Sequence, residues 1–539
     1  MNLKKLSITL LLGTLLLTSC SLVSSIQTKT SQEDSSSSYI EERSSSQSEN
    51  SSSTSQSEES KSSSGSKEEE TKLFNFYCVN DFHGSILEKA NATYYEAGIK
   101  KYFGELKRLK EKDPEHTIIL SAGDMWQGSL ESNYYYGKDV TEAMNEVPFD
   151  AMTLGNHEFD YGQQYIFENL ELANFPFLAG NIVKWKNGPT EEKWDKRILS
   201  STIIEKDETK IGIIGMIGDG QTTSIVSPNV EDITFTNAEK YAIQESKSLK
   251  KQGCSAVMLV IHAPNSTITG DSKNKGWSIR YKLKDYFDGI FTGHTHQIEE
   301  EQYSNVPLVQ AGANGSAYSY IQLSIKGSEV ECSDYKAVSS SKSWEEEASI
   351  ASIYNKYINE ESFIAKASEV AGTLNGGNLD KNGVARLGCK AIYDAYKEKY
   401  PSLVLSMENS QRSNLNKGRI TYSDIYKATP FMNNIIIANV KGSDILNEAA
   451  YAQTYTEDID NYSSLESNKF YTIAVIDYLY YHQDTNKNYN YFPSAKNQII
   501  EIENTHPYQL TFDYIKNQKN STINSSSFSA NAKGFNLYK

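Results

Sequence analysis

Histidine, aspartate and asparagine residues stand at the ends of five short apolar runs. Each run is typical of a buried strand, and each stops at side chains that can bind a metal ion. A single buried histidine is more often a hydrogen-bonded core residue than a ligand. However, the chain has only eight histidines and five of them belong to this set, so the clustering favours one shared site. The set comprises Asp81, His83, Asp124, Asn156, His157, Asp160, His262, His294 and His296.

The elements that must position these residues are predicted to be parallel strands. Near-continuous apolar runs bounded by glycine fit strands that helices cover on both faces, and ligands of such sheets collect at the carboxyl ends of the strands. We therefore expect the five strand ends to meet in one crevice. Asp81 and His83 are two residues apart, which at an extended strand end directs both side chains to one face. His294 and His296 repeat this spacing after Gly293.

The ligand types indicate the metal and the reaction. Imidazole, carboxylate and carboxamide groups without thiolates suit Mn, Zn, Fe, Co or Ni. Seven plausible ligands are too many for one tetrahedral ion, but they suit two ions that share a carboxylate. Two ions roughly 3.5 to 4 Å apart can polarise a phosphoryl group and supply a metal-bound hydroxide for in-line attack. The residues therefore predict a phosphoester hydrolase.

Five motifs occur in a fixed order: DFHG, GDMWQGS, GNHEFDYG, the histidine of VIHA, and GHTHQ. Together they resemble the sequence blocks of the calcineurin-like metallophosphoesterases, in the branch of bacterial and animal 5'-nucleotidases and related hydrolases of sugar nucleotides and cyclic phosphodiesters. The resemblance implies an α/β chain with two domains. The first is a four-layer α/β/β/α catalytic domain, and the second is an α+β nucleotidase-type domain that supplies substrate specificity.

The resemblance also implies a role for each residue. Asp124 would bridge the two ions, and His157 would stabilise charge on the phosphoryl group or the leaving oxygen. Asp160 would hydrogen-bond with His157 and fix its tautomer; alternatively, it caps a helix that begins near Tyr161. The first ion would be bound by Asp81, His83 and His296, and the second by Asn156, His262 and His294.

The first 70 residues indicate where the protein is located relative to the cell membrane. Residues 1–20 combine two lysines with a short apolar stretch and end in Leu-Thr-Ser-Cys, which resembles a bacterial lipoprotein signal with Cys20 as the lipidated residue. Residues 21–70 are mostly Ser, Glu, Gln, Asn, Thr and Lys, which predicts a disordered tether. We expect an enzyme outside the cytoplasmic membrane, anchored to it by lipid.

The remaining chain is long enough for two domains. We predict a catalytic domain over 71–337, a connecting helix over 338–362 and the second domain over 363–539. Helical patterns cover 102–112, 238–252 and 387–399, while the runs KIGIIGMIG, PFLAGNIV, PLVQAGA, NNIIIANV and KFYTIAVIDYLYY predict strands.

The second half carries the predicted substrate site. GRITYSDIYKATPFMNNIIIANVKGSDI resembles the family's carboxy-terminal domain, and Phe431 and Tyr478 fall where two rings would sandwich a nucleobase. The alternative is that both rings belong to the core. Three positions depart from the family's pattern. ENSQRSN keeps the arginine of a Gly-Gly-Ile-Arg motif as Arg412 but lacks its glycines, and HQDTNKN keeps only the aspartate of a Gly-Gly-Asp-Gly motif, as Asp484. Cys389 stands where relatives commonly have an asparagine. Arg412 would bind phosphate or ribose, and Asn409 would replace a lost polar contact.

The charge and the cysteine content of the chain indicate which kinds of partner and site to expect. The formal net charge of -16 argues against a nucleic-acid surface, whereas two metal ions would still attract an anionic substrate. The four cysteines after Cys20 are widely spaced in apolar contexts, which predicts buried free thiols.

Three functions stay open: a surface 5'-nucleotidase, the same metal chemistry on a cyclic nucleotide, sugar nucleotide or other phosphomonoester, and a catalytically silent binding lipoprotein. The oligomeric state stays open too.

Overall fold

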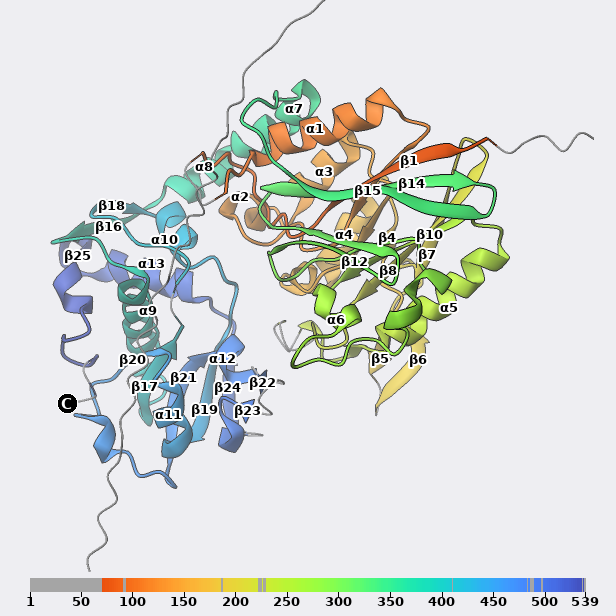
Figure 1. Cartoon of the computed structure of the whole chain (residues 1–539). Helices are drawn as coiled ribbons and strands as arrows, with labels where there is room; N and C mark the ends of the chain where they lie inside the picture. Colours follow the sequence, from red (N-terminus) through yellow and green to blue (C-terminus); the bar gives the residue numbers. More distant parts are fainter. Residues whose placement is uncertain are drawn as a thin grey trace, which may run out of the picture. The chain divides into compact units, whose positions relative to one another are not determined.

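The computed structural model describes residues 70–90, 94–185, 188–221, 225, 229–409, 411–481, 483–484, 489–495, 498–535 and 537 (Figure 1). The expected signal peptide with Cys20, and the expected tether apart from Glu70, lie outside the described residues. None of the described helices combines the length and the apolar character needed to cross a bilayer.

The first sheet has the strand order β15-β14-β1-β2-β3-β4. Its central strands β1 to β4 run parallel, and the long hairpin of β14 and β15 pairs antiparallel with β1. The bounds are β1 Lys72–Val79, β2 Thr117–Ser121, β3 Ala151–Thr153, β4 Phe177–Leu178, β14 Ala317–Lys326 and β15 Glu329–Ser339.

The second sheet has the order β12-β13-β11-β10-β8-β7. Strands β8, β10, β11 and β13 are parallel, and β7 and β12 close the two edges in antiparallel orientation. The bounds are β7 Ser201–Lys206, β8 Thr209–Ile217, β10 Ala256–His262, β11 Gly289–Phe291, β12 Ile298–Tyr303 and β13 Val306–Ala311. A small third sheet contains β5 Ile182–Trp185, β6 Pro189–Lys193 and β9 Ile233–Phe235.

The two large sheets pack face to face and helices cover their outer faces, so the predicted four-layer architecture is confirmed. Phe76 and Leu120 of the first sheet share one buried core with Met258 and Val260 of the second. Apolar residues at helical spacing on α1 pack with α3 against the outer face of the first sheet, and α5 does the same on the second. The helices are α1 Gly98–Lys112, α2 Leu130–Tyr134, α3 Lys138–Glu146, α4 Gln163–Leu172, α5 Ala238–Lys251 and α6 Asn265–Thr269.

The expected single connecting helix is two helices, α7 Ala348–Ile358 and α8 Glu361–Ser368. The Glu360 carboxylate accepts a hydrogen bond from the Phe363 backbone N–H and so begins the second helix. Ile350 of α7 packs in the core of the first half, whereas Phe363 of α8 packs in a core of the second half.

The second half is an α+β fold, as predicted. A five-stranded sheet has the order β20-β17-β21-β19-β24, and a three-stranded sheet has the order β18-β16-β25. Its strands are β16 Val370–Asn375, β17 Leu403–Glu408, β18 Gly418–Thr421, β19 Ile435–Lys441, β20 Gln453–Tyr455, β21 Phe470–Ile476, β22 Gln483–Asp484, β23 Tyr489–Asn490, β24 Ile499–Glu503 and β25 Thr522–Asn524. Its helices are α9 Lys381–Tyr396, α10 Tyr422–Ala428, α11 Gly442–Glu448, α12 Asp477–Tyr481 and α13 Pro507–Asn517.

The run KFYTIAVIDYLYY is not one strand. Strand β21 ends at Ile476, and α12 begins at Asp477. The buried Asp477 carboxylate accepts hydrogen bonds from the Asn434 backbone N–H at 2.7 Å and from Asn433 Nδ2 at 2.6 Å. These contacts hold the start of the helix beside β19, and they place Tyr478 on a helix rather than on a strand.

The four described cysteines are free thiols, as predicted. Cys78, Cys254 and Cys389 are buried, whereas Cys332 is only half-buried because it lies on the hairpin strand β15.

Candidate metal centre

The polar ends of five strands come together, and they belong to both large sheets. Two groups of ligand atoms result, and within each group all the atoms lie within 4.8 Å of one another. Strands β1, β2 and β3 of the first sheet and strands β10 and β11 of the second supply the residues. A crevice at the edge of one sheet would not hold them all. One group is Asp81, His83 and His296, and the other is Asp124, His262 and His294.

The backbone at these residues differs from the expected extended geometry. Asp81 and His83 follow the end of β1 and adopt left-handed φ angles of 49° and 52°. Asp124, His294 and His296 are also left-handed, with φ of 56°, 81° and 60°. Non-glycine residues rarely adopt this conformation. Tight turns, rather than strand alternation, therefore direct these side chains to the centre.

The first group presents two imidazole nitrogens to one point. His83 Nδ1 lies 2.8 Å from the Gln127 carbonyl oxygen and donates to it, so Nε2 of the neutral ring carries a lone pair. Burial lowers the pKa of His83 to about 3, which keeps the ring neutral. Its Nε2 lies 2.9 Å from His296 Nε2, and the buried Asp81 carboxylate lies 3.5 Å from the same His296 atom.

The second group surrounds the Asn156 side-chain oxygen. His262 Nδ1 donates to the Ala122 carbonyl at 2.7 Å, so Nε2 faces Asp124 Oδ2 at 3.0 Å and Asn156 Oδ1 at 3.1 Å. His294 Nδ1 lies 3.0 Å from the same Asn156 oxygen. Burial lowers the pKa of His262, but Asp124 more than offsets it and the pKa is about 9. Without an ion, His262 Nε2 therefore carries a proton that faces the Asp124 and Asn156 oxygens. A metal cation would take the place of this proton.

Both groups suit divalent ions. Nitrogen and oxygen atoms with lone pairs point at shared positions, the residues are mostly buried, and each group includes a carboxylate. This donor set matches ions of borderline hardness and carries no thiolate.

One buried carboxylate ties two of the ligand loops together. Glu158 is fully buried and accepts hydrogen bonds of 2.7 Å from the backbone N–H groups of Asp124, Met125 and Gly155. These donors lie on the loop after β2 and the loop after β3. Sequence reasoning did not assign Glu158 a role; its place in GNHEFD, between the ligand block and Asp160, was the available signal.

His157 and Asp160 form a hydrogen-bonded pair. His157 Nδ1 lies 2.7 Å from Asp160 Oδ2, and its backbone N–H donates to Asp124 Oδ1 at 2.8 Å. Burial lowers the pKa of His157, but Asp160 and Asp124 outweigh it and the pKa is about 10. Helix α4 begins at Gln163 after Gly162 and has no side-chain cap, so Asp160 does not cap it.

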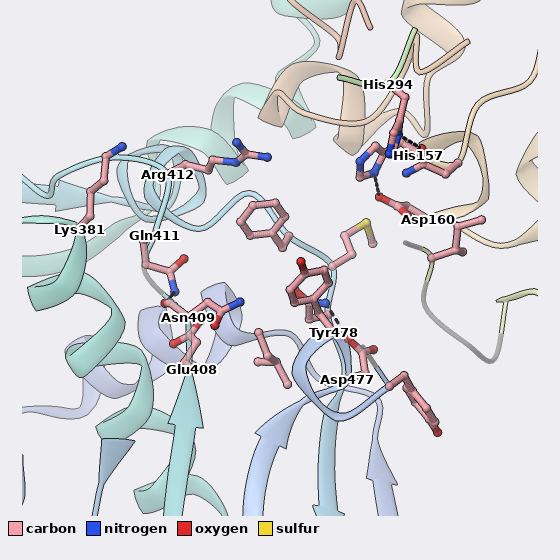
Figure 2. A pocket seen from close by; sticks show the side chains of 17 residues that line it. His157, Asp160, His294, Lys381, Glu408, Asn409, Gln411, Arg412, Asp477 and Tyr478 are labelled. Carbon is pink, nitrogen blue, oxygen red and sulfur yellow. Dashed lines mark hydrogen bonds and ion pairs between the residues drawn. The ribbon is translucent and has the colours of Figure 1, made fainter. Parts of the chain in front are cut away.

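A cavity of about 600 Å³ adjoins the centre. From the first half His157, Asp160, Asn156 and His294 line it, and from the second half the predicted residues Asn409, Arg412, Phe431 and Tyr478 do so. Figure 2 shows His157 and Asp160 on one side and Arg412, Asn409 and Tyr478 on the other. We call it the main cavity.

Phe431 and Tyr478, the two rings expected to sandwich a nucleobase, are not core residues. Tyr478 is 41% exposed and Phe431 is half-buried, and the Arg412 guanidinium lies 5.1 Å from the centroid of the Phe431 ring. The side chain of Asp484 lies outside the described residues. The cavity lining also includes Lys381, Glu408, Gln411 and Asp477, which the sequence analysis did not single out.

Comparison with known families agrees with this geometry. Residues 74–298 match the model of the calcineurin-like phosphoesterases, and residues 336–448 match that of the 5'-nucleotidase C-terminal domain. The chain belongs to the calcineurin-like phosphoesterases of the 5'-nucleotidase type. The fold class expected from the sequence motifs is thereby confirmed.

Relatives of this phosphoesterase differ in their named substrates. Endonuclease YhcR of Bacillus subtilis is 26% identical over 403 residues, which cover 68% of this chain and 32% of the relative. NAD 5'-nucleotidase of Haemophilus influenzae is 31% identical over 201 residues, which cover 37% of this chain and 31% of the relative. The chain thus spans about a third of the length of these relatives. The crystal structure of a 5'-nucleotidase precursor from Thermus thermophilus shares the fold, with a TM-score of 0.64, 16% identity, and coverage of 84% of this chain and 99% of that one.

Proposed function

We propose that this phosphoesterase uses two divalent ions, such as Mn, Zn, Co or Fe, to hydrolyse nucleotides in the manner of a 5'-nucleotidase. The observation that carries the proposal is the 2.9 Å approach of His83 Nε2 to His296 Nε2, together with the two imidazoles around Asn156 Oδ1. Imidazole nitrogens that converge in this way on each other and on carboxamide and carboxylate oxygens provide the ligands that divalent cations need.

Each residue then has a role. Asp81, His83 and His296 would hold one ion, and Asn156, His262 and His294 the other, with Asp124 between them. Two bound ions neutralise charge on a phosphoryl group and lower the pKa of an attacking water. Asp160 accepts from Nδ1 of His157, and the raised pKa of about 10 keeps the ring doubly protonated near neutral pH. Its Nε2 can therefore also present an N–H, to a phosphoryl oxygen or to the leaving oxygen.

The main cavity would hold the rest of the nucleotide. A base between Phe431 and Tyr478 would gain roughly 1 to 3 kcal/mol of stacking from each ring. Arg412 would bind phosphate or ribose through its planar fork, with Asn409 and Asp484 as further polar contacts. The names of the relatives, which include a NAD 5'-nucleotidase, support a nucleotide as the substrate.

A second candidate is the same chemistry on a sugar nucleotide, a cyclic nucleotide or another phosphomonoester. The segment that replaces the family's glycines favours it, because Glu408, Asn409 and Gln411 give this part of the cavity a different polar lining. For the location, we propose a lipid anchor at Cys20 that tethers the enzyme outside the cell membrane; the resemblance of residues 1–20 to a lipoprotein signal supports it.

The test is phosphate release by the purified protein with Mn²⁺, across AMP, ATP, a cyclic nucleotide, UDP-glucose and an aryl phosphate. Preference for nucleotides supports the main proposal. Activity on the aryl phosphate alone indicates a competent centre with another substrate, and no release from any compound contradicts the proposed activity and favours a binding protein.

A further inference from the structure

One buried carboxylate connects the two elements that carry the aromatic rings of the main cavity. Asp477 is the first residue of α12 and comes directly before Tyr478, whose side chain lines the cavity. Figure 2 shows Asp477 and Tyr478 next to each other at the start of this helix. The Asp477 carboxylate binds residues 430–434, which include the other ring, Phe431. We call residues 430–434 the Phe431 loop.

Three hydrogen bonds join α12 to the Phe431 loop. Asn433 Nδ2 donates to Asp477 Oδ1 at 2.6 Å, and the Asn434 backbone N–H donates to Oδ2 at 2.7 Å. In return, the Asp477 backbone N–H donates to the Asn434 carbonyl at 3.0 Å. Asp477 is only 1% exposed, and burial raises its pKa to about 6, so at about pH 8 the group is ionised and accepts at both oxygens. Both oxygens have protein partners, which suits a group that positions its neighbours.

The Phe431 loop is also held from two other directions. The Gln127 side chain donates to the Pro430 carbonyl at 2.9 Å, and His506 Nδ1 donates to the Asn433 carbonyl at 3.1 Å. Phe431 therefore follows a fixed residue and precedes another. The contacts with α12 are the ones that relate the position of this ring to that of Tyr478.

Stacking on a flat base depends closely on where the rings lie. A gap of roughly 0.5 to 1 Å beyond the best contact distance loses a quarter to a half of the attraction between the facing atoms. Rings that are already in place also lose less conformational freedom when the ligand binds. Tyr478 is 41% exposed and Phe431 is half-buried, so core packing alone does not hold them.

We propose that Asp477 is a positioning residue that fixes the spacing of Phe431 and Tyr478 and thereby sets the affinity for substrates that carry a flat base. This inference rests on the proposed nucleotide function and adds a determinant of its specificity. Asp477 acts through the two rings and not on the phosphoryl group. Its loss should therefore weaken the binding of the base and leave the binding of phosphate at the metal centre unchanged.

The test compares AMP with inorganic phosphate, which has no ring, using adenosine formation by the purified protein with Mn²⁺ at about pH 8. Asp477→Ala should raise KM for AMP about 5-fold or more. The inhibition constant for inorganic phosphate should stay within about 2-fold of the wild type, and kcat should change much less than KM. Calorimetry should show a matching loss of affinity for adenosine. If Asp477→Ala is insoluble, Asp477→Ser decides, because its hydroxyl suits the first turn of a helix but is too short to reach both donors.

Asp477→Asn is the rescue variant. Its amide oxygen can accept from the Asn434 N–H, and its N–H₂ can donate to the Asn433 side-chain oxygen once that amide turns over. KM for AMP should return to within about 2-fold of the wild type.

Asp444→Ala is the matched control for a purely structural effect. Asp444 is a buried acid in the first turn of α11, accepts from the Ser494 backbone N–H at 2.8 Å, and is not among the residues that line the main cavity. Its removal should lower Tm but leave KM for AMP at the wild-type value.

A double-mutant cycle tests whether Asp477 acts through the ring. In Phe431→Ala, the further change Asp477→Ala should raise KM for AMP by about 2-fold only, because one of the two rings it positions is already gone. Full additivity would overturn the inference, and so would an unchanged KM in Asp477→Ala or an equal rise in the inhibition constant for phosphate. In those cases AMP hydrolysis by the wild type still supports the nucleotidase function. If the wild type neither hydrolyses AMP nor binds adenosine, the nucleotide function fails, and the inference fails with it.

Discussion

The Nε2 atoms of His83 and His296 face each other at 2.9 Å, although the two residues come from different sheets. His83 donates its Nδ1 proton to the Gln127 carbonyl, so the atom that faces His296 has a free lone pair when the ring is neutral. The backbone of the loop after β2 thus fixes the tautomer that a metal ligand needs, an arrangement common around metal-bound histidines.

Replacement of Asp124 should remove metal and activity together. Its carboxylate lies 3.0 Å from His262 Nε2 and accepts a hydrogen bond from the His157 backbone N–H. It therefore links a metal-ligand histidine to the loop that carries His157. We expect Asp124→Asn to lose at least one bound Mn²⁺ and nearly all activity. We also expect the rise in Tm that Mn²⁺ gives the wild type to shrink, because a ligand stabilises only the state that binds it. Elemental analysis and thermal melts measure both effects; two ions retained in the variant would refute the bridging role.

Glu158→Gln should weaken metal binding without removing any ligand. The carboxylate accepts three backbone N–H groups, whereas the amide would turn its own N–H₂ toward at least one of them. We expect a loss of about 1 to 3 kcal/mol in unfolding free energy and a Mn²⁺ midpoint about 10-fold higher or more. A purely structural role would lower the stability of the metal-free protein and leave the Mn²⁺ midpoint unchanged.

His157→Asn should separate catalysis from metal binding. His157 is hydrogen-bonded to Asp160 and faces the main cavity, but it belongs to neither ligand group. Turnover should fall roughly 100-fold or more, as expected for the loss of a proton donor, while metal content stays at the wild-type level. Asp160→Asn should give a smaller fall in kcat. Unchanged turnover in His157→Asn would remove this residue from the mechanism.

Much of this centre was predictable because the sequence marks strand ends clearly. Buried strands need apolar runs, so the polar residues that interrupt them at Asp81, Asp124 and His262 stand out. The left-handed turns were not predictable from spacing, since tertiary hydrogen bonds such as Asp81 N–H to the Gly123 carbonyl hold them. The distribution of strands over two sheets also depends on long-range pairing.

The substrate side was less predictable for a physical reason. A positioning residue such as Asp477 is recognised by its burial and by its hydrogen bonds to Asn433 and Asn434, and neither has a signature in local sequence. Lys381 opens helix α9, where a lysine is ordinarily a solvated surface residue, and only the fold brings it beside Arg412 in the cavity lining.

Phe431→Ala should raise KM for nucleotides while leaving an aryl phosphate nearly unaffected. A lost stacking contact of about 1 to 3 kcal/mol corresponds to roughly a 5-fold or larger rise in KM. Phe470→Ala is the matched control, because Phe470 is an exposed ring of the same half that is absent from the cavity lining. Similar changes for both substrates in Phe431→Ala would assign the ring a packing role.

Stability should depend on pH through His116, which lies at the opposite end of β2 from Asp124. Its Nδ1 lies 2.9 Å from Asp113 and its Nε2 3.3 Å from Asp207, so both nitrogens donate only when the ring is protonated, and these carboxylates raise the pKa of His116. A group whose pKa is higher in the folded protein than in the unfolded chain stabilises the fold. This contribution is complete below the unfolded pKa of about 6.5, and it is lost as the pH rises through the folded pKa. Because the three side chains are 30% to 45% exposed, solvent screens these ion pairs, and we expect His116 to contribute at most about 1 kcal/mol to the free energy of unfolding. Urea unfolding of the wild type and His116→Gln should differ by this amount near pH 5.5 and converge at alkaline pH; a difference that persists there would show that packing against Phe74, rather than charge, stabilises the site.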